Sequence, residues 1–249
     1  MTIQLKHQPT ARLWEVDAVR GIAVIAMVFF HLVWDLQFVG LSSVNVFSDP
    51  WQIFARSIGT TFTFLLGLSL WLVATRLTLE ALWRYTVRRS ITLVGFGLLI
   101  TLGTRLFVGD AYVRFGILHL LGSMLVLSLP FVRAPLWLTL TTGIAMILVG
   151  AYFTTLRAPF PWLVSVGVAQ AGVEMVDYYP LLPWGGAALL GVACGRICYP
   201  EGRRRLALPD LGSLAPIRGL RFLGRHSLLI YLLHQPVLLG TLLALQTLR

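Results

Sequence analysis

The sequence predicts an all-α protein, a polytopic transmembrane bundle of about seven helices. Hydrophobic residues make up 57% of the 249 residues and charged residues only 12%, whereas a soluble domain has about 25% charged residues. The apolar residues form runs of about 20, the length that crosses a bilayer as a helix. Because a chain of 249 residues has the length of a single helix bundle, we expect one transmembrane domain over residues 1–249.

The expected spans follow from these apolar runs. A polar tail over residues 1–16 precedes the first span, and a proline-containing segment at 157–183 separates the fifth span from the sixth. Proline interrupts helices, so we expect no continuous span in that segment, although residues 162–176 fit a helix lying in the membrane interface. The seven spans are expected at residues 17–40, 51–75, 90–107, 111–130, 136–156, 183–199 and 225–245.

The sixth span combines small residues with both cysteines. Cys194 and Cys198 lie one helical turn apart, and two thiols alone are too few ligands for a zinc site. We therefore expect them to pack, and we expect no metal. Small residues let membrane helices approach closely, and we expect this of Gly185, Gly186, Gly191 and Gly195.

The basic residues indicate how the chain is oriented. A net charge of +10 would suggest a nucleic-acid partner in a soluble protein. Here the basic residues gather in the connections at 76–89 and 203–225, as they do in cytoplasmic loops of membrane proteins, so we exclude nucleic acid. We expect a multi-pass protein of the inner cell membrane, with its N-terminus in the cytoplasm and its C-terminus outside.

The first span carries the residues best suited to catalysis. His31 and Asp35 lie within the apolar run, where ionisable residues are costly and usually functional. They are one turn apart, so the carboxylate can hold one imidazole nitrogen and leave the other as a general base. Arg20 shares the helical face of His31, about 16 Å toward the cytoplasm, and forms with Arg12 a basic edge suited to phosphate. The alternatives are a histidine that only hydrogen-bonds a neighbouring helix and arginines that extend to the interface.

Further polar residues are candidates for binding a substrate. Arg56 lies near the depth of Asp35, so an ion pair between them and a contact with an anionic acceptor are both open. His119 and His234 reach the bundle middle by depth, which fits a shared polar cavity or separate packed residues. Trp184 suits either a sugar-stacking surface or an interfacial aromatic belt. The candidates are Arg56, Arg114, His119, Trp184, Tyr231 and His234.

Two other classes of membrane protein fit the same histidines. His31, His119 and His234 are candidate ligands of a haem or another metal. Buried histidines also relay protons in membrane proteins, which would suit a small proton-coupled transporter.

Several stretches resemble a known family. Arg20, ten further residues and His31 resemble the arginine and histidine signature of family-three membrane acyltransferases. The opening from Arg12 to Gly21, Arg-Leu-Trp-Glu-Val-Asp-Ala-Val-Arg-Gly, more specifically resembles the start of the heparan-alpha-glucosaminide N-acetyltransferase catalytic domain and its short prokaryotic relatives. The resemblance covers most of the chain, because later blocks of the superfamily resemble residues 54–67, 114–122 and 223–236.

The resemblance implies a membrane acyltransferase. An acyl group, expected to be acetyl, would pass from acetyl-CoA on the cytoplasmic side to an amine or hydroxyl of a sugar-containing or lipid-linked acceptor at the external face. His31 would be the catalytic histidine and Asp35 would orient it, while Arg12 and Arg20 would contact the donor. Whether His31 acts as a general base or carries the acyl group covalently stays open, as do the acceptor and assembly into a homo-oligomer.

Overall fold

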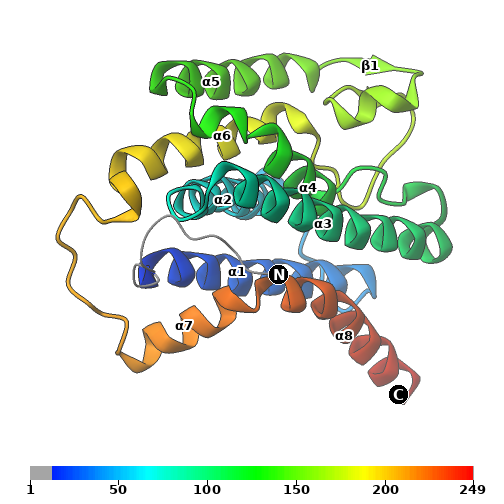
Figure 1. Cartoon of the computed structure of the whole chain (residues 1–249). Coiled ribbons are helices and arrows are strands. Elements are labelled where there is room, and N and C mark those ends of the chain that lie inside the picture. Colours follow the sequence, from blue (N-terminus) through cyan, green and yellow to red (C-terminus); the bar gives the residue numbers. More distant parts are fainter. Residues whose placement is uncertain (1–12, 249) are drawn as a thin grey trace. The chain divides into compact units, whose positions relative to one another are not determined.

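The computed structural model describes residues 13–248, which form eight α-helices, four short 3-10 helices and one two-stranded sheet (Figure 1). The chain divides into a central unit, residues 63–207, and a terminal unit made of residues 13–62 and 208–248; α2 contributes to both. The predicted all-α class is confirmed, while the single-domain assignment stays a prediction. The α-helices are α1 (Trp14–Phe38), α2 (Asp49–Ala74), α3 (Leu79–Val108), α4 (Ile117–Leu127), α5 (Leu136–Phe153), α6 (Leu181–Cys198), α7 (Ala215–Arg225) and α8 (Ser227–Thr247).

Within residues 13–248, six helical segments are long and apolar enough to cross a membrane: α1, α2, α3 with the following 3-10 helix η1 (Gly109–Ala111), α5, α6 and α8. This agrees with the predicted polytopic membrane protein. Each of them overlaps one of the seven expected spans.

The span expected at residues 111–130 is shorter than its apolar run suggested. Helix α4 has 11 residues, about 16 Å, whereas the hydrocarbon layer is about 30 Å thick. It begins only after Gly116, where the backbone is extended and a carboxylate oxygen of Asp177 accepts the N–H of Ile117 at 3.1 Å. After Leu127 the chain turns into the 3-10 helix η2, which starts at Pro130.

Two basic connections are helical where loops were expected. Helix α3 begins at Leu79, capped by the Thr78 hydroxyl, and therefore includes Arg84, Arg88 and Arg89. Helix α7 lies inside the expected loop before the last span. Arginine favours helix, so a basic connection can continue a helix beyond its apolar part.

The interfacial helix expected over residues 162–176 is not present. In its place, the 3-10 helix η3 (Pro161–Ser165) is followed by a short strand, β2 (Ala169–Gln170), which pairs in parallel with β1 (Arg157–Ala158). Proline at the start of η3 and the left-handed backbone of Gly167, with φ of 129°, explain why no helix continues here.

Tyr178 stabilises this segment through a hydrogen bond, and we expect this stabilisation to be lost at alkaline pH. Its hydroxyl donates to the carbonyl of Val164 at 3.0 Å, and burial raises the pKa of Tyr178 to about 12 against the opposing charge of Arg157. This stabilisation should therefore be complete below pH 10.0, the ordinary value, and be lost as the pH rises to about 12. Unfolding of wild type and of Tyr178→Phe should show this loss in the wild type alone. Phenolate absorbance that rises equally in both proteins around pH 12 would contradict the assignment.

The glycines of α6 mediate close packing in the central unit, as predicted. A Cβ atom added at Gly186 would lie 2.4 Å from the carbonyl oxygen of Gly143 in α5, and one at Gly191 would lie 2.0 Å from that of Phe64 in α2. Added Cβ atoms at Gly185 and Gly195 would meet Met124 and Trp71 at 2.7 and 2.8 Å. Figure 1 shows α5 and α6 as neighbours in this unit.

The terminal unit is built on an equally close contact between α1 and α7. A Cβ atom at Gly21 would lie 2.1 Å from the carbonyl oxygen of Leu220, and one at Gly224 would lie 2.0 Å from that of Asp17. Helix α7 therefore packs against the first turns of α1, as Figure 1 shows. Helix α8 follows after His226 and contacts α1 as well.

Candidate functional site

The two histidines in the terminal unit lie together. His31 of α1 and His234 of α8 have ring centroids 4.6 Å apart and planes 82° apart. The Nδ1 atom of His31 lies 2.9 Å from the carbonyl oxygen of Met27, and that of His234 lies 2.7 Å from the carbonyl oxygen of Tyr231. Because a carbonyl only accepts, each Nδ1 carries the proton. In the neutral form, each ring therefore presents an Nε2 lone pair.

A buried carboxylate adjoins these histidines. Asp35 has no exposed surface, and its Oδ1 accepts a hydrogen bond of 2.6 Å from Nε2 of Gln235, the residue after His234. Three buried atoms of this cluster meet no partner among residues 13–248: Oδ2 of Asp35, Oε1 of Gln235 and Nε2 of His234. All three are acceptors when the carboxylate is ionised and the imidazole is neutral. In these protonation states, no described residue donates a hydrogen bond to any of the three atoms.

Aromatic side chains flank the cluster. Phe30 packs edge to face on His31 at 5.6 Å, and it contacts Trp51 and Phe54 of α2 at 6.2 and 6.4 Å. Such an apolar environment strengthens electrostatic interactions and makes an unpaired polar atom costly. The three acceptors without partners therefore point to a ligand that donates hydrogen bonds.

Two contacts expected from the sequence are not formed. Asp35 does not hydrogen-bond His31, because its Oδ1 is held by Gln235 and its Oδ2 has no partner among the described residues. The backbone of Met27 orients the imidazole instead. For the same reason Asp35 does not pair with Arg56, which is exposed. The catalytic roles of His31 and Asp35 nevertheless stay predictions.

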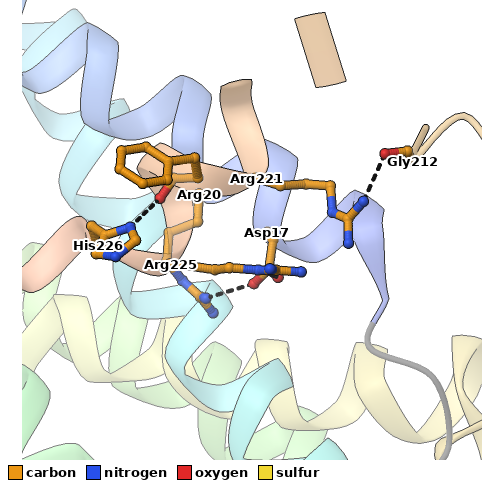
Figure 2. A network of polar contacts seen from close by, with 7 residues as sticks. Asp17, Arg20, Gly212, Arg221, Arg225 and His226 are labelled. Carbon is orange, nitrogen blue, oxygen red and sulfur yellow. Dashed lines mark hydrogen bonds and ion pairs between the residues drawn. The ribbon is translucent and has the colours of Figure 1, made fainter. Parts of the chain in front are cut away.

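A charged network lies at the start of α1. Asp17 is buried, with 3% of its surface exposed. Its two carboxylate oxygens lie 3.3 Å from an Nη atom of Arg20 and 3.2 Å from Nε of Arg225. Figure 2 shows Arg225 reaching Asp17 from α7, with Arg221 beside them donating to the carbonyl of Gly212. The expected basic edge therefore includes two arginines of α7, and Arg12 lies outside the described residues.

Other predicted binding residues belong to the central unit. Nδ1 of His119 accepts the N–H of Gly116 at 3.3 Å, and its ring fills the space over Gly97, where an added Cβ would lie 2.9 Å from it. These contacts give His119 a packing and capping role. The guanidinium of Arg114 lies 4.4 Å from the ring centroid of Tyr112.

Two aromatic candidates pack against other side chains. Trp184 pairs with Tyr179 at 4.9 Å in the central unit. Tyr231 lies in the terminal unit beside His234, with ring centroids 5.7 Å apart, and its carbonyl orients that histidine. The structure therefore joins His31, Asp35, Tyr231 and His234 in one cluster and adds Gln235, which is not among the candidate site residues predicted from the sequence. The signal was present, since Gln235 is a polar residue within an apolar span.

The histidine pair alone does not make a metal site, because a zinc site takes at least three protein ligands. Within residues 13–248, no group of three His, Cys, Asp or Glu side chains is placed to hold a metal.

The spans and the cluster define a class, a multi-pass membrane protein with a buried, acceptor-rich polar site. Comparison with protein families narrows this class to a membrane transferase. The family model described as heparan-alpha-glucosaminide N-acetyltransferase, catalytic, matches residues 12–236, and the chain belongs to this family. The match includes His31, Asp35, His234 and Gln235. Searches of curated proteins and of solved structures gave no match.

Proposed function

We propose that this protein transfers an acetyl group from acetyl-CoA to the amine of a sugar-containing or lipid-linked acceptor. Membership of the family supports the reaction, since acetyltransferases of this kind use acetyl-CoA as donor in general. The observation that favours an amine over a hydroxyl is the set of three buried acceptor atoms on Asp35, Gln235 and His234. An ammonium group brings three donors and a positive charge, which complements this set. A hydroxyl brings one donor.

His31 is the proposed general base. When its Nε2 lone pair takes the place of one of these three acceptors, it accepts a proton from the ammonium group, and the neutral amine then attacks the thioester carbonyl carbon. Collapse of the tetrahedral intermediate forms the amide and breaks the carbon–sulfur bond, and the departing thiolate takes the second amine proton. His31 returns its proton to water. The Met27 carbonyl holds the required tautomer by accepting from Nδ1.

Arg20 is the proposed contact for the phosphates of the donor. It lies at the start of α1, and its bond to Asp17 fixes its orientation. Arg12, which lies outside the described residues, is a second proposed contact for these phosphates. We place the protein in the inner membrane of the cell with its N-terminus in the cytoplasm. In this orientation the donor binds from the cytoplasmic side and the acceptor from the external side. Arg56, Arg114, His119, Trp184 and Tyr231 remain candidates for contacts with the rest of the acceptor, together with His234.

The amine proposal is tested with two sugars and one isosteric variant. In lipid nanodiscs with labelled acetyl-CoA, the protein should acetylate glucosamine and should not acetylate glucose, which has a hydroxyl in place of the amine. Asp35→Asn should raise the KM for glucosamine about tenfold or more, because a hydrogen bond to a charged group contributes about 1.5–3 kcal/mol. Asp49→Asn, at an exposed carboxylate, is the control. Equal acetylation of both sugars, or an unchanged KM in Asp35→Asn, would contradict the proposal.

Proton-coupled transport is the second candidate, favoured by the buried carboxylate of Asp35 and the paired imidazoles of His31 and His234 in the same unit. Proteoliposomes without any acyl donor distinguish the two. Proton flux that disappears in Asp35→Asn, without acetylation of any acceptor, would favour transport.

A further inference from the structure

Helix α7 has an exposed face that combines arginine with an aromatic ring. Arg218 and Phe222 lie one helical turn apart on this face, and Phe222 has 61% of its surface exposed. Arg225 follows at the same spacing, but its Nε bonds to Asp17 of α1. The ring of Phe222 lies 4.3 Å from that of His226, which bonds back to the carbonyl of Phe222. These contacts hold the aromatic ring on the surface.

The opposite face of α7 packs against the start of α1, and α7 itself leads into the start of α8. Gly224 packs on Asp17 and Leu220 packs on Gly21, so α7 lies beside the charged first turns of α1 and not beside its apolar middle. At its own end, α7 is followed by the apolar helix α8, which begins at Ser227. With 11 residues, α7 is about 16 Å long and too short to cross a bilayer.

We propose that this face of α7 lies in the headgroup layer of the membrane and binds anionic phospholipids. The Arg218 guanidinium matches a lipid phosphate in charge, and a ring beside it fits the boundary between headgroups and acyl chains. A free phosphate ion would satisfy Arg218 but would leave Phe222 in water. A lipid covers both parts of the face. This proposal does not depend on acetyl transfer.

A fluorophore on α7 tests lipid contact directly. Gly219 is exposed, and an added Cβ there would meet nothing within 4 Å. Bimane attached to Gly219→Cys, in a protein carrying Cys194→Ser and Cys198→Ser, reports quenching by acyl-brominated lipids in phosphatidylcholine nanodiscs. At equal mole fraction, brominated phosphatidylglycerol should quench about fivefold more effectively than brominated phosphatidylcholine. In Arg218→Gln this preference should fall several-fold.

The matched control uses Gly240→Cys on α8, which is also exposed and open. There the two brominated lipids should quench equally. Absence of quenching at position 219 would overturn the placement of α7 in the bilayer, and equal quenching by both lipids would overturn headgroup selection. Loss of the preference on adding inorganic phosphate would show an ion site and overturn the lipid proposal.

Discussion

Substitution of His31 by alanine should lower the rate of acetyl transfer about 10²–10⁴-fold, the usual contribution of a general base, without weakening acetyl-CoA binding. His31→Gln should lose as much activity, because glutamine can hydrogen-bond but cannot accept the proton. Transfer to glucosamine measures the rate, and calorimetry in nanodiscs measures donor binding. A His31→Gln protein that keeps most of its rate would exclude His31 as the base.

The same calorimetry distinguishes a direct contact of Arg20 with the donor from an indirect effect of the charged network around Asp17. Arg20→Gln should weaken acetyl-CoA binding, while His31→Ala should not. Arg225→Gln is the matched control, because it breaks the bond to Asp17 from the other helix and leaves Arg20 in place. Equal loss of donor binding in both arginine variants would assign the effect to the network around Asp17 and not to a phosphate contact of Arg20.

Gly224→Ala should destabilise the protein by about 1–3 kcal/mol or more, the cost of overpacking a tight contact. The new methyl group would lie 2.0 Å from the carbonyl oxygen of Asp17, a backbone atom, so the two helices must separate. Gly21→Ala, 2.1 Å from the carbonyl oxygen of Leu220, should act in the same way. Thermal unfolding of the purified protein measures the effect. Acetyl transfer should fall too, because α8 follows α7 directly.

Gly219→Ala is the control for this prediction, since it lies on the same helix with open space around it. Alanine is favoured over glycine within a helix by about 0.5–1 kcal/mol, so this variant should be slightly more stable than wild type. If Gly224→Ala and Gly219→Ala behaved alike, the close contact between α1 and α7 would be refuted.

The sequence predicted the apolar spans because their hydrophobicity is a local property, and it located His31 and Asp35 because ionisable residues are conspicuous inside such spans. The partner of Asp35 could not be found in this way, because Gln235 is 200 residues away along the chain. The start of α4 depends on Asp177, which accepts the N–H of Ile117 from 60 residues away along the chain. Contacts between distant segments are set by packing, which local patterns do not encode.

Helix α7 was missed for a different reason. Its arginines indicate a cytoplasmic loop, whereas Ile217, Leu220 and Gly224 recur at the spacing of one helical face. Charge and periodicity indicate different elements here, and the structure agrees with the periodicity. An interfacial helix shows both, because one face meets headgroups and the other meets protein.

The bond from His31 to the carbonyl of Met27 affects how this site tolerates sequence change. In the catalytic triads of soluble hydrolases a separate acidic side chain orients the histidine, and one codon change can remove it. Here a peptide unit of the same helix has that position, and every amino acid supplies the same carbonyl. Substitutions at position 27 therefore leave the orienting group in place. Only a change that bends α1, such as a proline within the turn from Met27 to His31, would take it away.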